Sequence, residues 1–301
     1  FSTSEEQGGR YIVLYFSLIA VLNRLTQIPI DLLWNAIRFI VILFLVYAVA
    51  RLCEVLFDHR RERLMAIALF LFGGGLGWTI PVLRGLFPIL NRIISSDLTS
   101  YLGYSVFGFL FHPLAMLSLA FILLAVHHWI RFDEKKKIRD SAFAAIYVLL
   151  AFFNHPAAGL FGFILGLLFF VARFIKRGMT GEKKWDFFHF MGESWPFAVA
   201  GALALLYVGW ASRDYVYAFH QAYYFSWSRT EPLWIYPFSF GLPFFLTIYS
   251  FILRKIHFSS KDGRFLLVTW LLLALALANL LPAGAKYLYF IFPALSILGV
   301  P

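Results

Sequence analysis

Charged residues are scarce in this 301-residue chain, and so are cysteines. Asp, Glu, Lys and Arg together make up 14% of the residues, whereas hydrophobic residues make up 61%. A soluble globular protein is about one-quarter charged. The one cysteine, Cys53, excludes an internal disulfide bond. The composition therefore predicts a membrane protein, and it is far too apolar for a disordered chain.

Sequence motifs for familiar chemistry are also missing. The chain has no phosphate-binding loop, no paired-cysteine metal site, no nucleophile elbow and no HExxH motif. His112, His155 and His220 are the histidines that could join an acid around a metal ion, but their scattered spacing argues against such a site. We therefore predict no metal site, and the sequence leaves the cofactor unknown.

Long apolar runs fill most of the chain. About twenty helical residues cross the hydrocarbon core of a membrane, which predicts an all-α fold with about nine transmembrane helices in a single transmembrane domain, 1–301. The predicted spans are 32–52, 64–83, 113–130, 141–153, 157–174, 195–211, 238–253, 265–281 and 287–301. The shorter run 11–22 predicts a helix lying at the membrane interface, inside an external segment 1–31.

Positive charge lies in short clusters between the apolar runs. The net charge is +10, and 18 of the 26 Lys and Arg residues fall in 51–63, 131–140, 173–184 and 254–264. Basic short loops mark the cytoplasmic face, because Lys and Arg resist translocation. One orientation places all four clusters inside, which predicts a multi-pass protein of the cell (plasma or inner) membrane, with membrane lipid as a partner. No soluble domain presents these charges, so no nucleic-acid partner is expected.

Two His-Pro pairs interrupt the apolar sequence on the predicted outer side. One begins at His112, and the other begins at His155, directly after Asn154. Proline is favoured as the first residue of a helix, so each pair either begins a helix or forms part of a site. The predicted helix 141–153 spans only about 20 Å, which would put Asn154 and His155 below the outer surface. Non-helical backbone at that depth is buried in protein or lines a wet cavity, and we expect a cavity that opens outward.

Two further groups of polar residues are predicted on the outer side. Asp31, Asn35 and Arg38 share one face of the first span. An intramembrane arginine is a functional candidate, and a structural pair with Asp31 is the equal alternative. Asp97, in "SSDLTS", either caps a helix or belongs to a site.

The stretch 212–237 is an external segment rich in aromatic residues. Four of them recur at every fourth position: Tyr215, Phe219, Tyr223 and Trp227. On a helix they would form one stripe, either an interfacial belt or a platform for an acyl chain or a sugar ring. Arg213 and Arg229 flank the stripe and could hold a phosphate. His220 and Lys286 complete the polar residues predicted on this side.

Several stretches resemble the large membrane glycosyltransferases of the C-type (GT-C) fold, a group that includes the dolichyl-phosphate-mannose–protein mannosyltransferases. The resemblance is carried by "LLWNAIRFIVILFLVYAVARL", "LFLFGGGLGW", "FLFHPLAMLSLAFILLA", "LLAFFNHPAAGLFGFIL" and "LPAGAKYLYFIFPALSILG". It spans most of the chain and is closest to poorly characterised prokaryotic members.

The resemblance implies transfer of a sugar from a polyprenyl-phosphate donor on the outer face, with an acid of the first external loop as base. The first transmembrane helix and most of that loop would precede Phe1, so the chain is expected to be a fragment. Glu5, Glu6 and Asp97 are the candidate acids, and His155 is a further catalytic candidate. The residues expected on the donor phosphate are Arg38, Arg229 and Lys286. The other expected substrate contacts are His112, Asn154, Arg213, His220 and Trp227.

Two other functions stay open. A transporter or lipid flippase would favour internal repeats and helices broken near mid-membrane, whereas no repeat is visible and the polar groups cluster outside. A non-catalytic subunit would pack against partners through glycine faces such as Gly159, Gly162 and Gly166. An outward cavity lined by His155, Arg38 and an acid would favour the glycosyltransferase.

Overall fold

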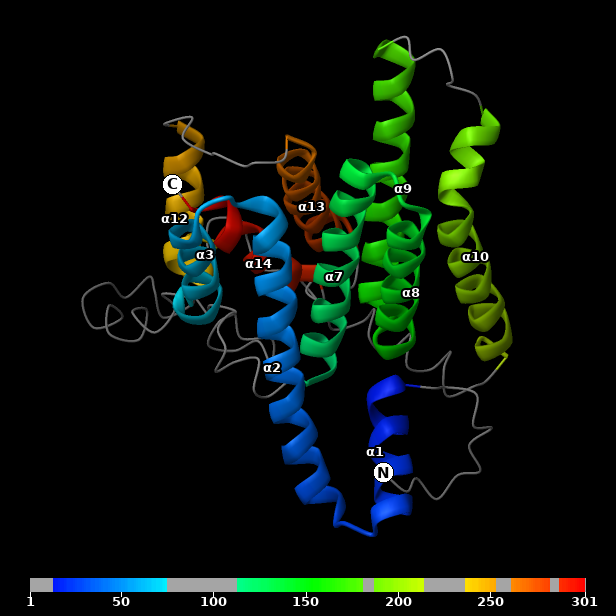
Figure 1. Cartoon of the computed structure of the whole chain (residues 1–301). Coiled ribbons are helices and arrows are strands. Elements are labelled where there is room, and N and C mark those ends of the chain that lie inside the picture. Colours follow the sequence, from blue (N-terminus) through cyan, green and yellow to red (C-terminus); the bar gives the residue numbers. More distant parts are fainter. Residues whose placement is uncertain are drawn as a thin grey trace, which may run out of the picture.

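The protein is a bundle of apolar α-helices (Figure 1). The computed structural model describes residues 13–74, 113–180, 187–213, 236–252, 261–281 and 287–300, and these contain no β-strand. The helices are α1 (Leu14–Thr26), α2 (Ile30–Leu56), α3 (Arg60–Phe72), α7 (Pro113–Lys135), α8 (Ile138–Asn154), α9 (Pro156–Thr180), α10 (Phe187–Ala211), α12 (Tyr236–Ile252), α13 (Lys261–Leu280) and α14 (Leu288–Leu298).

Five of these helices, α2, α7, α9, α10 and α13, are long and apolar enough to cross a membrane. The prediction of an all-α polytopic membrane protein is therefore confirmed. Four of the nine predicted spans correspond to shorter helices within the described residues, namely α3, α8, α12 and α14, of 13, 17, 17 and 11 residues.

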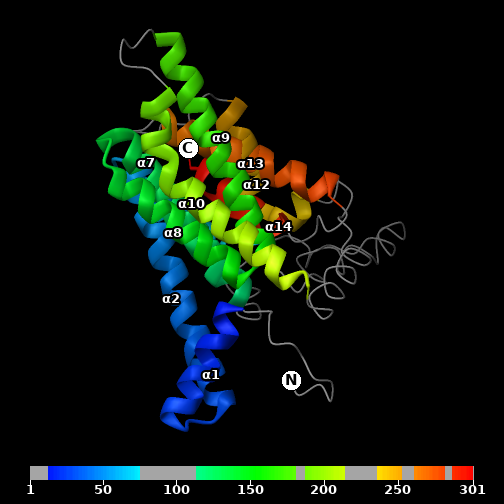
Figure 2. The same ribbon diagram turned by 90° about the vertical axis from the view of Figure 1, so that its right-hand side faces the viewer.

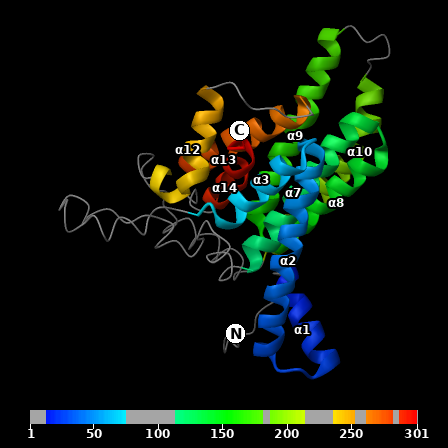
Figure 3. The same ribbon diagram turned by 60° about the vertical axis from the view of Figure 1, so that its left-hand side comes forward.

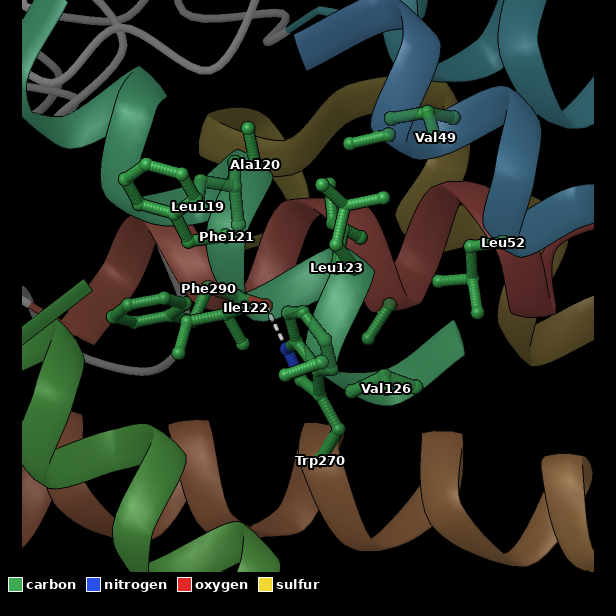
Figure 4. Close-up of a cluster of buried hydrophobic side chains, with 14 of the residues drawn as sticks. Val49, Leu52, Leu119, Ala120, Phe121, Ile122, Leu123, Val126, Trp270 and Phe290 are labelled. Atoms are coloured by element: carbon green, nitrogen blue, oxygen red, sulfur yellow. Dashed lines mark hydrogen bonds between the residues drawn. The ribbon is translucent and has the colours of Figure 1, made fainter. Parts of the chain in front are cut away.

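Helix α7 forms the centre of the bundle. In the most apolar stretch of 18 residues, 83% of α7 is buried inside the protein, whereas the corresponding share for α10 is 28%. Figure 4 shows why: Ile122 and Leu123 of α7 lie among side chains of α2, α13 and α14. Trp270 of α13 donates a hydrogen bond to the carbonyl oxygen of Phe290 at 2.6 Å, which joins α13 to α14 beside this cluster. The core is thus held by close packing, the main force available between helices in lipid.

Proline begins two of the central helices, as expected. Pro113 is the first residue of α7 and Pro156 is the first residue of α9. Helix α8 begins at Ile138 rather than 141, because its first turn includes part of the basic cluster. It is therefore 17 residues long, about 26 Å at 1.5 Å per residue, and longer than predicted.

Glycine lets several helices approach closely. A side chain at Gly162 would lie 2.6 Å from Ile122 of α7, and one at Gly166 would lie 2.6 Å from both Trp129 and Phe197. The glycine face of α9 therefore packs inside the bundle. At Gly241, where φ is +56°, α12 bends, and a side chain there would collide with the carbonyl oxygen of Gly74.

The first two helices form a hairpin that projects from the bundle (Figure 3). The chain turns between them at Gln27, which is left-handed with φ 57°, and Asn23 donates a hydrogen bond to the Ile28 carbonyl oxygen at 2.7 Å. Tyr15 packs edge-on against Trp34 at 5.1 Å between ring centroids. The predicted interfacial helix at 11–22 thus corresponds to α1, which packs antiparallel to the first half of α2.

Candidate functional site

The helix ends divide the bundle into two ends of different chemistry. Helices α2, α7, α9 and α12 end, and α3, α8, α10 and α13 begin, at the top of Figure 1. We call this the basic end, because these helix ends carry the described part of the four Lys and Arg clusters. We call the opposite end the His155 end. Its described arginines are few: Arg24, Arg38 and Arg213.

Asn154 joins three helices at the His155 end. Its side-chain NH₂ donates to the carbonyl oxygen of Leu114 at 2.7 Å and to the hydroxyl of Ser118 at 2.6 Å, both on α7. Its side-chain oxygen accepts from the backbone N–H of Tyr15 at 3.2 Å. Asn154 is 2% exposed. It was predicted as a substrate contact, and these bonds leave it one oxygen lone pair for that purpose.

His155 occupies the break between α8 and α9. Its backbone N–H donates to the Ala151 carbonyl oxygen at 2.8 Å, and its own carbonyl oxygen accepts from the N–H of Gly159 at 3.1 Å. These bonds end one helix and start the next, so His155 has a fixed place in the fold. Its partly buried ring meets the Tyr289 ring edge-on, with centroids 6.3 Å apart.

Two buried tyrosine hydroxyls lie near this break. Tyr289 is 1% exposed and Tyr15 is 0% exposed, and neither hydroxyl has a hydrogen-bond partner among the described residues. A buried hydroxyl without a partner costs about 1–3 kcal/mol and invites a ligand or water. The partly buried Arg38 guanidinium lies within electrostatic range of the Tyr15 hydroxyl.

Arg38 does not form the structural pair with Asp31 that was the alternative for this stripe. No ion pair joins them in the described part of the chain, and Asn35 donates to the Asp31 backbone oxygen at 3.0 Å instead. Arg213, exposed just beyond α10, is separate from Arg38 but lies at the same end of the bundle. Within the described residues, neither Arg38 nor Arg213 has an ion-pair partner, and both lie at the same end as Asn154 and His155.

Eight predicted site residues lie outside the described residues. They are Glu5, Glu6, Asp97, His112, His220, Trp227, Arg229 and Lys286. All four residues of the aromatic stripe also lie outside them, as does the rest of the segment 212–237 apart from 212–213 and 236–237. Their roles stay predictions.

The basic end contains an ion network that was not predicted. Arg173 of α9 pairs with Asp133 of α7 at 2.6 Å and with Glu193 of α10 at 3.1 Å. Arg177 adds a bidentate pair to Glu193, with both N–O distances at 3.0 Å. The Arg173 guanidinium also lies 4.6 Å from the Phe132 ring centroid. One feature of the sequence points to this network: Glu193 lies just before the predicted apolar span 195–211.

The position of His127 and His128 beside a basic cluster predicts a solvated helix face, but the structure buries His127 and leaves His128 only partly exposed. His127 is 2% exposed and donates through Nδ1 to the Arg51 carbonyl oxygen at 2.7 Å. His128 donates through Nδ1 to Asp140 at 2.9 Å, and Arg131 lies 3.6 Å from the same carboxylate oxygen. The expectation was wrong because both histidines pack against α2 and α8 rather than facing water.

The described residues contain no group of three or more His, Cys, Asp or Glu side chains that could hold a metal ion. Comparison with known protein families, with curated proteins and with solved structures finds no match for the chain. A functional hypothesis therefore rests on the chemistry of the residues at the His155 end.

Proposed function

We propose that the protein is a membrane glycosyltransferase of the GT-C type. It would transfer a sugar from a polyprenyl-phosphate donor to an acceptor hydroxyl at the His155 end. The observation that carries this proposal is the break at Asn154 and His155. Asn154 and His155 lie between two apolar helices, and each is tied into the fold by its own hydrogen bonds. Two tyrosine hydroxyls near them lack partners within the described residues, and Arg38 of α2 lies within electrostatic range of one of these, that of Tyr15.

The reaction needs a base and a cation, and this end offers both kinds of side chain. The acceptor oxygen forms a bond to the anomeric carbon while the bond from that carbon to the phosphate oxygen breaks. A proton passes from the acceptor hydroxyl to a base within hydrogen-bond reach, for which His155 is a candidate beside the acids Glu5, Glu6 and Asp97. The departing polyprenyl phosphate carries the bonding electrons, and Arg38 would stabilise its charge.

We further propose that the basic end faces the cytoplasm and that the protein lies in the cell membrane. The uneven distribution of Lys and Arg between the two ends supports this orientation. Cysteine introduced at Lys136 should react with a membrane-impermeant maleimide only after the membrane is opened, and cysteine introduced at Arg24 should react in intact cells. Cys53 is buried and gives little background. The reverse pattern would overturn the orientation.

Sugar transfer is the direct test of the activity. Membranes that contain the full-length protein would receive radiolabelled polyprenyl-phosphate sugars, and incorporation into acceptor would be compared with that of His155→Ala, Arg38→Ala and Asp97→Asn. The matched control is His59→Ala, which removes an exposed histidine at the basic end. Thermal unfolding of each purified variant separates loss of activity from loss of fold.

The expected result is a fall of at least tenfold in transfer for His155→Ala and Arg38→Ala with folding intact, because each loses a group that acts on the reacting atoms. His59→Ala should keep full activity. Absence of transfer by the wild type with every donor would contradict the proposal and favour the transporter or non-catalytic subunit.

A further inference from the structure

Helix α10 carries an open hollow on its outer face. The helix lies at the edge of the bundle, and Figure 2 shows it in front of α8. The hollow has a volume of about 590 Å³, within the range of about 300–1,000 Å³ that is typical of ligand clefts. Its described lining residues are Ala202, Leu205, Leu206, Gly209, Trp210 and Arg213.

These residues form one continuous face of the helix. They follow one another at intervals of one or three residues, which keeps them on the same side. Leu205 and Leu206 are 74% and 70% exposed, so the upper wall is apolar and uncovered within the described residues. At Gly209 an added Cβ would meet nothing within 4 Å, so the helix surface is open at the middle of this face.

Charge marks the end of the hollow that lies at the His155 end of the bundle. Arg213 is exposed, and its side chain makes no hydrogen bond or ion pair with any described residue. None of the described lining residues is acidic. Trp210, directly before it on this face, is a residue type that favours the membrane–water interface. Within the described residues the hollow thus pairs an apolar wall with an unpaired cation beside an interfacial residue type, which fits an anionic amphiphile.

The length of the hollow identifies the kind of amphiphile. Ala202 and Arg213 are eleven residues apart, about 16 Å along a helix. Half of the hydrocarbon core of a bilayer is about 15 Å thick. The hollow therefore matches one leaflet, the depth of a phospholipid acyl chain, whereas a long polyprenyl chain would overrun it.

We propose that this face of α10 binds an anionic glycerophospholipid of the bilayer. The lipid phosphate pairs with Arg213, and one acyl chain lies over Gly209 and along Leu205 and Leu206 towards Ala202. This lipid is a bound structural ligand and not the sugar donor, so the site stands whether or not the protein is a glycosyltransferase.

Native mass spectrometry of the purified full-length protein tests the site, with phosphatidylglycerol as the probe and diacylglycerol, which lacks the phosphate, for comparison. The variants are Arg213→Gln, which removes the cation, and Gly209→Leu, which fills the hollow without meeting a neighbouring atom at its Cβ. The matched control is Arg24→Gln, which removes an exposed arginine from the same end of the bundle. Thermal unfolding checks that each variant is folded.

The site predicts one tightly bound phosphatidylglycerol on the wild type. Arg213→Gln should weaken it about fivefold, since an arginine at the membrane surface contributes about that much to binding an anionic lipid. Gly209→Leu should weaken both phosphatidylglycerol and diacylglycerol, and Arg24→Gln should change neither. Equal binding by all variants, or equal loss in Arg24→Gln, would overturn the site. Displacement of phosphatidylglycerol by polyprenyl phosphate at lower concentration would overturn the identity of the ligand.

Discussion

The two ends of the bundle hold their polar groups in opposite ways. At the basic end, Arg173, Arg177 and Glu193 pair side chain to side chain across helices. At the His155 end, Asn154 bonds mainly to backbone and to one serine, and two tyrosine hydroxyls lack partners within the described residues. The basic end pairs its charges with one another, although the Trp129 indole N–H and one Asp140 oxygen there lack a hydrogen-bond partner within the described residues. The His155 end instead leaves neutral hydroxyls without a partner in the same part of the chain.

This difference separates structural from functional chemistry. Burial of a charge is costly, and several paired charges offset that cost only when each keeps its partner. The network at the basic end therefore joins α7, α9 and α10 through charges that pair with one another. At the His155 end the polar groups are fixed by the fold but incompletely satisfied, which is what a binding site requires.

The largest effect is expected from removal of Glu193. Glu193→Ala leaves Arg173 and Arg177 without their shared carboxylate at a site where the glutamate side chain is 13% exposed. Loss of one partner of a buried ion pair costs about 3 kcal/mol of unfolding free energy. Denaturant unfolding in detergent, followed by tryptophan fluorescence, measures it. An unchanged midpoint would mean that the network does not stabilise the bundle.

A smaller loss is expected at the other end for Asn154→Ala. The variant loses three hydrogen bonds that tie α1 and α7 to α8, and we expect about 2 kcal/mol. Hydrogen exchange at the Tyr15 amide should become faster, because its acceptor is gone. Asn279→Ala is the control, since among the described residues that exposed asparagine bonds to Leu275 of its own helix and to Tyr236, far from Tyr15 in the sequence. Unchanged exchange at Tyr15 would contradict the joining role of Asn154.

Asp140→Asn should cost less again. The amide keeps the shape and an acceptor oxygen for His128 but removes the charge that faces Arg131. We expect about 1 kcal/mol, the difference between a charge-assisted and a neutral hydrogen bond. The interaction between Asp140 and Arg131 is measured from the unfolding free energies of Asp140→Asn, Arg131→Gln and the double variant. A coupling energy of zero would mean that the two side chains do not stabilise each other.

The smallest effect is expected for Glu54→Gln at the same end. Glu54 pairs with Arg51 within one helix, and both side chains are more than one-third exposed. Exposed pairs of this kind contribute about 0.3 kcal/mol. If Glu54→Gln unfolds like the wild type while Glu193→Ala is much less stable, then burial rather than charge alone determines how much an ion pair contributes to stability. A loss as large as that of Glu193→Ala would contradict this reading.

The membrane fold and several helix boundaries were predictable from the sequence. Hydropathy identifies the apolar helices because a helix that crosses lipid must be apolar along its length. Pro113 and Pro156 begin helices because the first residue of a helix needs no backbone N–H, which proline lacks. His155 was singled out by the same local signal, a polar break inside apolar sequence.

Long-range pairing was not predictable. Asn154 bonds to Tyr15, 139 residues away, and His127 bonds to a backbone oxygen of Arg51, 76 residues away. No local pattern encodes such partners, because they depend on which helices become neighbours. The charges of 131–140 and 173–184 were therefore interpreted as loops, although part of them forms the buried network at the basic end.

The contrast between the two ends is tested most directly by locating a bound sugar donor. A polyprenyl-phosphate sugar with a photoreactive group on the sugar would be crosslinked to the full-length protein in membranes, and the labelled peptides would be identified by mass spectrometry. Label is expected near His155 or Tyr289, and it should be competed by unlabelled donor and lost in Arg38→Ala. Label confined to the basic end, around Asp133 and Arg173, would contradict this expectation.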